Sequence, residues 1–147
     1  MHARSRTYAP VSVKVRTSFP THPLAQHVGG RLRLESVQNA NDQARTAAAT
    51  LQGREEPYRA LPWFWSEQGP MRLQMVGLAP PDGARYRRPG ASPQSFSVLH
   101  YVGGALRCVE SVNAPMDHIM ARRLLETGRN PEPELACNPA SPLKSFL

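Results

Sequence analysis

The 147-residue sequence lacks the short motifs by which many enzymes and nucleotide-binding proteins are recognised. It has no G-x-G-x-x-G turn for a dinucleotide and no phosphate-binding P-loop. It also has no nucleophile elbow, no H-E-x-x-H zinc motif and no close carboxylate pair placed for acid–base work. These absences argue against an enzyme with its own nucleotide or metal site, and no residue is predicted to be catalytic or to ligate a metal.

Cysteines and long apolar runs are also scarce. Cys108 and Cys137 are the only cysteines, and neither belongs to a C-x-x-C pair. Two cysteines do not make a disulfide framework, although the sequence leaves open whether the two form a single disulfide. No apolar run approaches the roughly 20 residues of a membrane span, and no signal-peptide pattern opens the chain. The sequence predicts a soluble cytoplasmic protein that does not cross a membrane.

The charge is strongly positive, at +7, and the first acidic residue is Glu35. Such a balance suits nucleic acid, an acidic membrane surface or an acidic protein as partner. The sequence has no helix-turn-helix, zinc-finger or aromatic RNA-binding pattern, which argues against nucleic acid. The length favours one domain with a core of its own.

Aromatic residues make up only 7% of the chain, yet three of them are consecutive. Trp63, Phe64 and Trp65 include both tryptophans, and polar Ser66 follows at once. One reading is a hydrophobic plug in the core, because large aromatics bury much area. The other is a wall against a flat cofactor or a partner protein. A turn after Phe64 is expected to point Trp63 into the core and Trp65 away from it.

The clearest predicted helix covers residues 36–52, with Ser36 as N-cap and Gly53 just past its end. Its first turn has free N–H groups and a partial positive charge that attract an electron-rich group. An apolar stripe at helical spacing predicts a face that packs closely on a neighbour. The stripe is Val37, Ala40, Ala44, Ala47, Ala48 and Leu51.

The second half of the sequence alternates in the manner of strands. Strands are predicted from residue 71, at 84–88, and at 95–102 and 105–112, the last two joined by a Gly103-Gly104 hairpin turn. A second helix is predicted over 115–127, with proline at its start and glycine just past its end.

The predicted strand at 95–102 has a definite expected orientation. Phe96 and Val98 are expected to face the core, and Ser95 and Ser97 to face away from it. His100 is interpreted as a half-buried strand residue, because no activating carboxylate is near it in the sequence.

Several short strings in a fixed order give the chain a family resemblance. The chain resembles the C-terminal part of the FAD-containing NAD(P)H:ferredoxin reductases that serve bacterial oxygenases and P450s. The resemblance runs from about Phe19 to Leu147. The strings are Glu35-Ser36-Val37-Gln38-Asn39-Ala40, Pro62-Trp63-Phe64-Trp65-Ser66, Leu73-Gln74-Met75-Val76-Gly77-Leu78, Ser95-Phe96-Ser97-Val98 and Pro142-Leu143-Lys144.

The resemblance implies an α+β fold: an antiparallel sheet of about five strands with helices on one side. It also implies that residues 58–147 are the reductase C-terminal domain. Residues 19–57 then correspond to the end of an FAD/NAD(P)-binding domain, whose last helix precedes the sheet. Residues 1–18 are a basic tail that matches nothing in the family.

The function implied by the resemblance is electron transfer from NAD(P)H through FAD to a ferredoxin-type iron–sulfur protein. In the family, the position of Val37 contacts FAD at the pyrimidine edge of the flavin. The position of Trp65 lies beside the flavin on the ferredoxin side. Arginines are the candidate docking residues for an acidic ferredoxin; they are Arg72, Arg85, Arg87 and Arg88.

One departure puts FAD binding by this chain in doubt. The family has a Gly-Asp pair just before the matched region, where this sequence has Val15, Arg16 and Thr17. The glycine-rich turns for the FAD and NAD(P)H pyrophosphates are also missing. We therefore expect a truncated gene product or a fragment that is inactive alone. The alternative is a stand-alone basic module that binds an acidic protein or nucleic acid.

Overall fold

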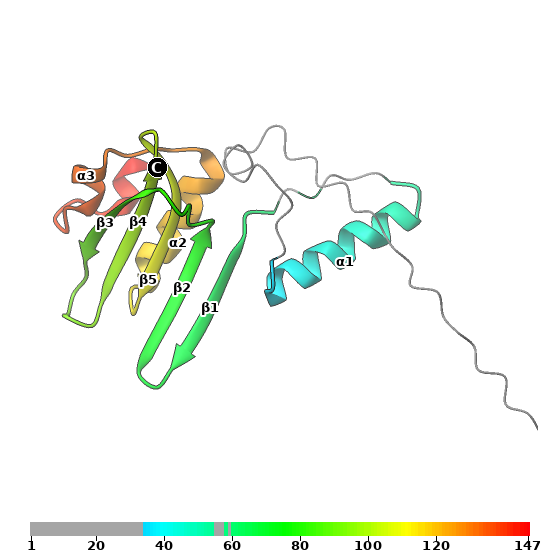
Figure 1. The fold of residues 1–147 in the computed structure, drawn as a ribbon, viewed down its shortest axis with the longest axis horizontal. Helices are drawn as coiled ribbons and strands as arrows, with labels where there is room; N and C mark the ends of the chain where they lie inside the picture. The colour runs from blue at the N-terminus through cyan, green and yellow to red at the C-terminus, as the bar shows by residue number, and fades with distance from the viewer. Residues whose placement is uncertain (1–33, 55–57, 59) are drawn as a thin grey trace, which may run out of the picture.

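The computed structural model describes residues 34–54, 58 and 60–147, in which five antiparallel strands form one sheet in the order β1-β2-β5-β4-β3 (Figure 1). The predicted basic tail 1–18 and the loop up to residue 30 lie outside the described residues. The strands are β1 (Trp63–Gln68), β2 (Met71–Gly77), β3 (Ala84–Pro89), β4 (Phe96–Val102) and β5 (Ala105–Val112).

Two hairpins make up most of the sheet. β1 pairs with β2, and β4 pairs with β5 through a turn in which Gly103 and Gly104 have φ of 55° and 77°. A two-residue hairpin turn of this type needs positive φ at both central positions, which glycine adopts without strain. The predicted hairpin is therefore confirmed, and β3 completes the sheet by pairing with β4.

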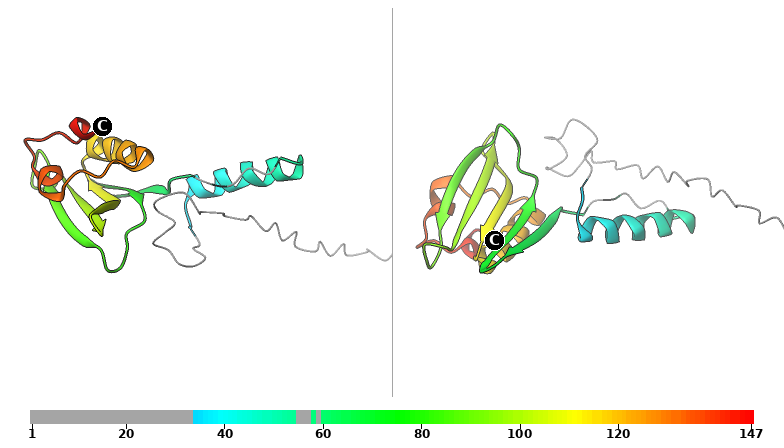
Figure 2. Two further views of the ribbon diagram at one scale, coloured as in Figure 1. Left: turned by 90° about the horizontal axis from the view of Figure 1, so that it is seen from above. Right: turned by 60° about the horizontal axis from the view of Figure 1, so that its bottom comes forward.

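All the described helices after the sheet lie on one of its faces (Figure 2). The largest has Pro115 in its first turn and ends at Gly128, whose φ of 67° is left-handed. The predicted α+β fold class is thus confirmed. None of the helices in the described part is both long and apolar enough to cross a lipid bilayer. The helices are α2 (Pro115–Thr127), α3 (Pro133–Cys137) and the 3-10 turn η2 (Leu143–Phe146).

The hydrophobic core lies between the sheet and α2. Val76, Leu99 and Val109 from three adjacent strands are fully buried against Leu124 of α2 and Leu143 of η2. Full burial of a Val or Leu side chain contributes about 1.5–3 kcal/mol, so these side chains hold the two layers together.

The expected orientation of β4 is wrong. Ser97 is completely buried on the helix side, whereas Phe96 and Val98 are only half-buried on the opposite face. The reason is a buried hydrogen-bond network: the Ser97 hydroxyl lies 3.0 Å from both the Ser111 hydroxyl and an Asp117 carboxylate oxygen. Partners distant in sequence satisfy the serine, so its burial costs little.

Helix α1 (Val37–Leu51) precedes the sheet and extends away from it (Figures 1 and 2). The Ser36 hydroxyl accepts a hydrogen bond from the Asn39 amide at 3.1 Å, which confirms the predicted N-cap. The predicted packed stripe is wrong, because Val37 and Leu51 are 66% and 79% exposed. Within this helix, burial is confined to Asn39 and Ala49.

Polar contacts, rather than the alanine stripe, connect α1 to the segment that follows it. The hydroxyl of buried Tyr58 donates to Asn39 Oδ1 at 2.9 Å, and the Trp63 amide donates to Gln38 Oε1 at 3.3 Å. These bonds bring the N-terminal turn of α1 to the start of β1.

Candidate functional site

The two tryptophans of the chain are stacked on each other. Their ring centroids lie 5.4 Å apart with an interplanar angle of 22°. The expected turn after Phe64 is wrong, because β1 continues to Gln68 as one strand paired with β2. Residues two apart on a strand point to the same face, so Trp63 and Trp65 share a side of the sheet.

The two rings differ in their surroundings. Trp63 is half-buried and packs against the hydrophobic core, with the His118 ring 6.3 Å away on its α2 side. The Arg122 guanidinium carbon lies 5.6 Å from the centroid of the Trp63 ring, within cation–π range. Trp65, in contrast, is 44% exposed. The pair therefore has an anchored inner ring and an open outer ring.

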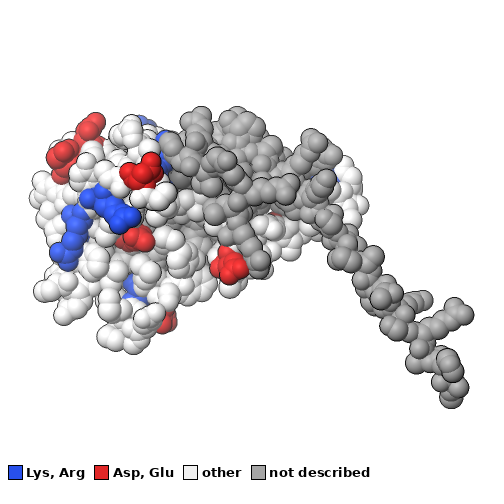
Figure 3. All heavy atoms as spheres, viewed as in Figure 1, with Lys and Arg blue, Asp and Glu red and all other residues white. Residues whose placement is uncertain are grey.

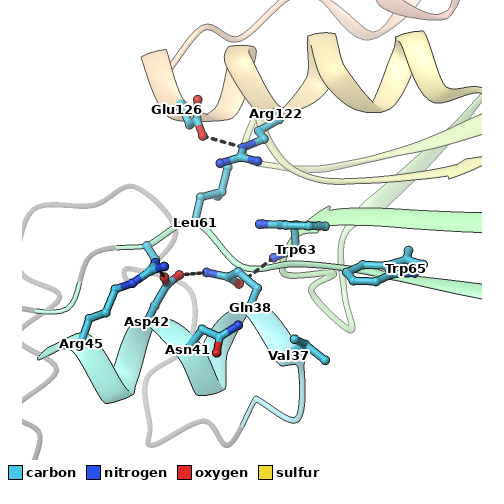
Figure 4. A pocket seen from close by; sticks show the side chains of 11 residues that line it. Val37, Gln38, Asn41, Asp42, Arg45, Leu61, Trp63, Trp65, Arg122 and Glu126 are labelled. Carbon is cyan, nitrogen blue, oxygen red and sulfur yellow. Dashed lines mark hydrogen bonds and ion pairs between the residues drawn. The ribbon is translucent and has the colours of Figure 1, made fainter. Parts of the chain in front are cut away.

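A cavity of about 670 Å³ opens between α1, the segment that leads into β1, and α2 (Figure 4). Val37 and Trp65, the two residues expected at a flavin, both line it. They come from different elements and meet because Gln38 and Asn39 hold α1 near β1. Other side chains that line the cavity are Gln38, Asp42, Arg45, Trp63, Arg122 and Glu126.

Two arginines flank the cavity, and each is paired with a carboxylate of its own helix. Arg45 lies 3.1 Å from Asp42 on α1, and Arg122 lies 2.8 Å from Glu126 on α2. The arginine side chains are 81% and 46% exposed, so these pairs add little to stability. Both cations remain available to an incoming anionic group.

His118 of α2 lies beside the inner tryptophan ring, Trp63. Its pKa is lowered, first by burial and then by the positive charges of Arg122 and Arg72. Its Nδ1 atom is buried and has no hydrogen-bond partner among the described residues. Each of these effects disfavours the protonated ring, so the neutral form supports the packing of Trp63 at neutral pH.

The four arginines expected to dock a ferredoxin do not form one patch. Arg72 is exposed on β2 and lies 3.6 Å from Glu67. Arg85 and Arg87 are exposed on β3, at the opposite edge of the sheet, with Arg87 4.7 Å from the Phe96 ring centroid. Figure 3 shows basic and acidic side chains close together on the sheet face opposite the helices, rather than one positive field.

Arg88 is inside the protein, which contradicts the expected docking role. Its side chain is 7% exposed and its guanidinium lies 3.2 Å from the Asp117 carboxylate. It also donates to the carbonyl oxygens of Ala136 and Asn138, at 2.8 and 2.7 Å. Arg88 therefore joins β3 to α2 and to α3, and it is unavailable to a partner.

Sequence reasoning missed the polar side of the cavity. Gln38, Asp42 and Arg45 follow one another at spacings of four and three residues, which places them on one face of a helix. The sequence carries this polar pattern as clearly as it carries the alanine stripe. The contact of Arg122 with the Trp63 ring has no signal in the sequence.

The sequence and the fold agree with one protein family. A family model described as Reductase C-terminal matches residues 63–147. Rhodocoxin reductase of Rhodococcus erythropolis is 46% identical over 115 residues, which cover 78% of this chain and 27% of that protein. Putidaredoxin reductase CamA of Pseudomonas putida is 34% identical over 116 residues, covering 79% of this chain and 28% of CamA.

Solved structures show the same similarity. The ferredoxin reductase for the CYP199A2 system from Rhodopseudomonas palustris matches with a TM-score of 0.72 and 43% identity. The covalent putidaredoxin reductase–putidaredoxin complex matches with a TM-score of 0.71 and 35% identity. Both matches cover 78% of this chain and 28% of the other. The chain thus spans less than a third of the length of these relatives.

Proposed function

Because the chain belongs to the Reductase C-terminal family, we propose that it is the C-terminal part of a flavoprotein reductase. In this proposal, electrons pass from NAD(P)H via FAD to a ferredoxin-type iron–sulfur protein. The chain contributes a wall for the flavin and a surface for the partner. Its two cysteines are free thiols, which suits a reducing compartment, and we place the protein in the cytoplasm.

The observation that carries the proposal is the shared cavity of Val37 and Trp65. Val37 is at the first turn of α1, where the helix dipole favours negative charge. Trp65 offers an exposed indole face on the other side of the cavity. A flat, electron-rich ring fits between a helix N-terminus and an aromatic face.

The residues present fit the ring of FAD but not its phosphates. Val37 and Trp65 would contact the ring, whereas the sequence holds no glycine-rich turn for a pyrophosphate. When bound, FAD supplies the hydride and electron-transfer chemistry, and the protein supplies position and electrostatics. We therefore expect that the isolated chain neither retains FAD nor oxidises NADH. Purified protein that stays yellow through desalting would contradict this.

The docking surface that we propose surrounds Trp65. Arg45 and Arg122 line the cavity beside it. Arg72 points to the same face of the sheet as Trp65, because Arg72 pairs with Glu67, which is two residues after Trp65 on β1. Positive side chains at the rim steer an acidic partner and fix its orientation. Arg85 and Arg87 are at the far edge of the sheet and are assigned a lesser role.

The test measures binding of an acidic [2Fe–2S] ferredoxin to the chain at several salt concentrations. We expect affinity to fall steeply with salt, because screening acts within about 10 Å at 0.1 M. Replacing Arg45 and Arg122 together by Ala should weaken binding more than replacing Arg85 and Arg87. A larger loss from the Arg85 and Arg87 variant would move the docking surface to β3, and equal losses would indicate an effect of net charge alone.

The same binding measurement distinguishes the proposed function from a second candidate, a stand-alone basic binding module. A stand-alone basic module is favoured by the exposed Arg85 and Arg87 on β3. It predicts that duplex DNA binds more tightly than ferredoxin and that Trp65→Ala has no effect on binding. Binding of ferredoxin that is insensitive to both salt and Trp65→Ala would overturn the proposed function.

A further inference from the structure

One side chain bridges α1 and the strand of the tryptophans. Gln38 accepts a hydrogen bond from the Trp63 amide at 3.3 Å through Oε1. Its Nε2 donates to Asp42, whose other carboxylate oxygen accepts from Arg45 at 3.1 Å. Figure 4 shows this chain of bonds running along one wall of the cavity, from Arg45 to the backbone of Trp63.

Among the described residues, few other contacts connect α1 to the sheet domain. Burial within the helix is confined to Asn39 and Ala49, and most of its apolar stripe is exposed. β1 is an edge strand, so a neighbouring strand covers only one of its sides. On the other side, Gln38 provides the Trp63 amide with an acceptor that water would otherwise have to supply.

We infer that Gln38 is a positioning residue that sets the distance between the N-terminal turn of α1 and the tryptophan pair. Val37 directly precedes Gln38 on α1. The amide that donates to Gln38 Oε1 belongs to Trp63, the first residue of β1. This role of Gln38 rests on the proposed function, because Gln38 would keep Val37 and Trp65 at the same cavity.

The chemistry of the amide explains why glutamine is suited to this position. The bridge needs an acceptor for Trp63 and, at the same time, a donor for Asp42, and a primary amide offers both. An ionised glutamate would only accept and would repel Asp42. Alanine at this position would remove both bonds and leave the helix attached through Asn39 and its buried contact with Tyr58.

The test is amide hydrogen exchange of the chain, followed by NMR at the Trp63 N–H. Gln38→Ala should lower the protection of this amide about fivefold or more, as expected for the loss of one hydrogen bond. The matched control is Gln43→Ala, which removes a glutamine of the same helix whose Nε2 donates to Asn39 at 3.1 Å. The control should leave protection of the Trp63 amide within about twofold, because it does not reach β1.

A second variant separates positioning from a general loss of stability. Gln38→Glu should speed exchange of the Trp63 amide at neutral pH, because the new carboxylate repels Asp42. Protection should return as pH falls to about 5, where one proton shared by the two carboxylates restores the donor to Asp42. The charged groups around this position are Asp42 and Arg45 on α1, and Arg122 and Glu126 on α2. The unmodified chain, measured over the same pH range, corrects for changes in overall stability.

The outcomes are distinct from those of the ferredoxin experiment, because hydrogen exchange needs neither FAD nor a partner. If Gln38→Ala and Gln43→Ala expose the Trp63 amide equally, or if neither does, the positioning role is wrong. If Gln38→Glu shows no recovery at low pH, the bond to Asp42 has no part in it. Ferredoxin binding can fail while these exchange results hold, in which case only the proposed function is overturned.

Discussion

The Arg122 guanidinium lies 5.6 Å from the Trp63 ring and 2.8 Å from the Glu126 carboxylate. One cation thus covers the inner ring of the tryptophan stack while it pairs with an acid of its own helix. Both interactions are open to solvent on one side, so each is weak by itself. The outer ring, Trp65, has no comparable cation over it in the described part of the chain and is 44% exposed. This asymmetry predicts different roles for the two tryptophans.

Trp63→Ala and Trp65→Ala should separate stability from function. Trp63 packs on the core, so its removal should cost about 3 kcal/mol, the lower end for a large aromatic, because the ring is half-buried. Trp65→Ala should cost less than about 1 kcal/mol. Urea unfolding of the isolated chain measures both values.

The functional half of this prediction needs a flavin-binding partner domain. With residues 19–147 grafted onto the N-terminal portion of a related reductase, Trp65→Ala should leave the graft folded and yellow. It should slow electron delivery to ferredoxin. If Trp65→Ala unfolds the graft while Trp63→Ala only slows transfer, the two roles are reversed.

Arg88→Ala should be among the most destabilising substitutions in the sheet domain. It leaves the Asp117 carboxylate, which is 18% exposed, without its cation, and it removes the donor to the carbonyls of Ala136 and Asn138. Breaking a buried ion pair on one side costs about 3–5 kcal/mol. Chemical denaturation measures the loss. The control is Arg85→Ala on the same strand, where the side chain is exposed and the change should stay within about 0.5 kcal/mol.

Glu126→Gln should strengthen binding of an acidic ferredoxin. The substitution frees Arg122 from its i,i+4 pair, which is worth about 0.3–0.5 kcal/mol, and it removes a like charge that faces the partner. We expect a gain in affinity of about twofold at low salt, which corresponds to the energy of that pair. Glu134→Gln makes the same charge change on α3, away from the cavity, and should have no such effect. Equal gains from both variants would indicate a net-charge effect only.

His118 should make the folded state sensitive to mild acid. Its pKa is lowered in the folded chain by burial, Arg122 and Arg72, so the unfolded chain takes up the proton first as pH falls. The stability that depends on neutral His118 is complete above the unfolded value of about 6.5 and is lost as pH falls below it.

The measurement is urea unfolding between pH 7.5 and 5.5. His118→Gln should flatten the dependence of the unfolding free energy on pH in this window, because the titrating ring is removed. Other groups titrate equally in both proteins and cancel in the comparison. An identical slope with and without the imidazole would show that His118 titrates alike in the folded and unfolded chains.

The sequence alone was sufficient for most of the local structure. Ser36 and Gly53 delimit α1, and Gly103-Gly104 marks the hairpin, because a cap or a positive-φ turn requires particular residue types at one place. The alternation of β2 and the proline and glycine around α2 act over the same short range. The ordered strings of the resemblance were sufficient to identify the family.

Only the tertiary structure decided which faces are buried and which charges meet. Ser97 and Arg88 are inside because Asp117 and Ser111, far away in the sequence, satisfy them. The alternation of residues along β4 does not show which set faces the helices. A shift of one residue would exchange the two faces of the strand. Likewise, Gln38 reaches Trp63 and Arg122 covers the Trp63 ring only once α1, β1 and α2 converge. Such contacts depend on the packing of distant segments, and no local window of sequence contains both partners.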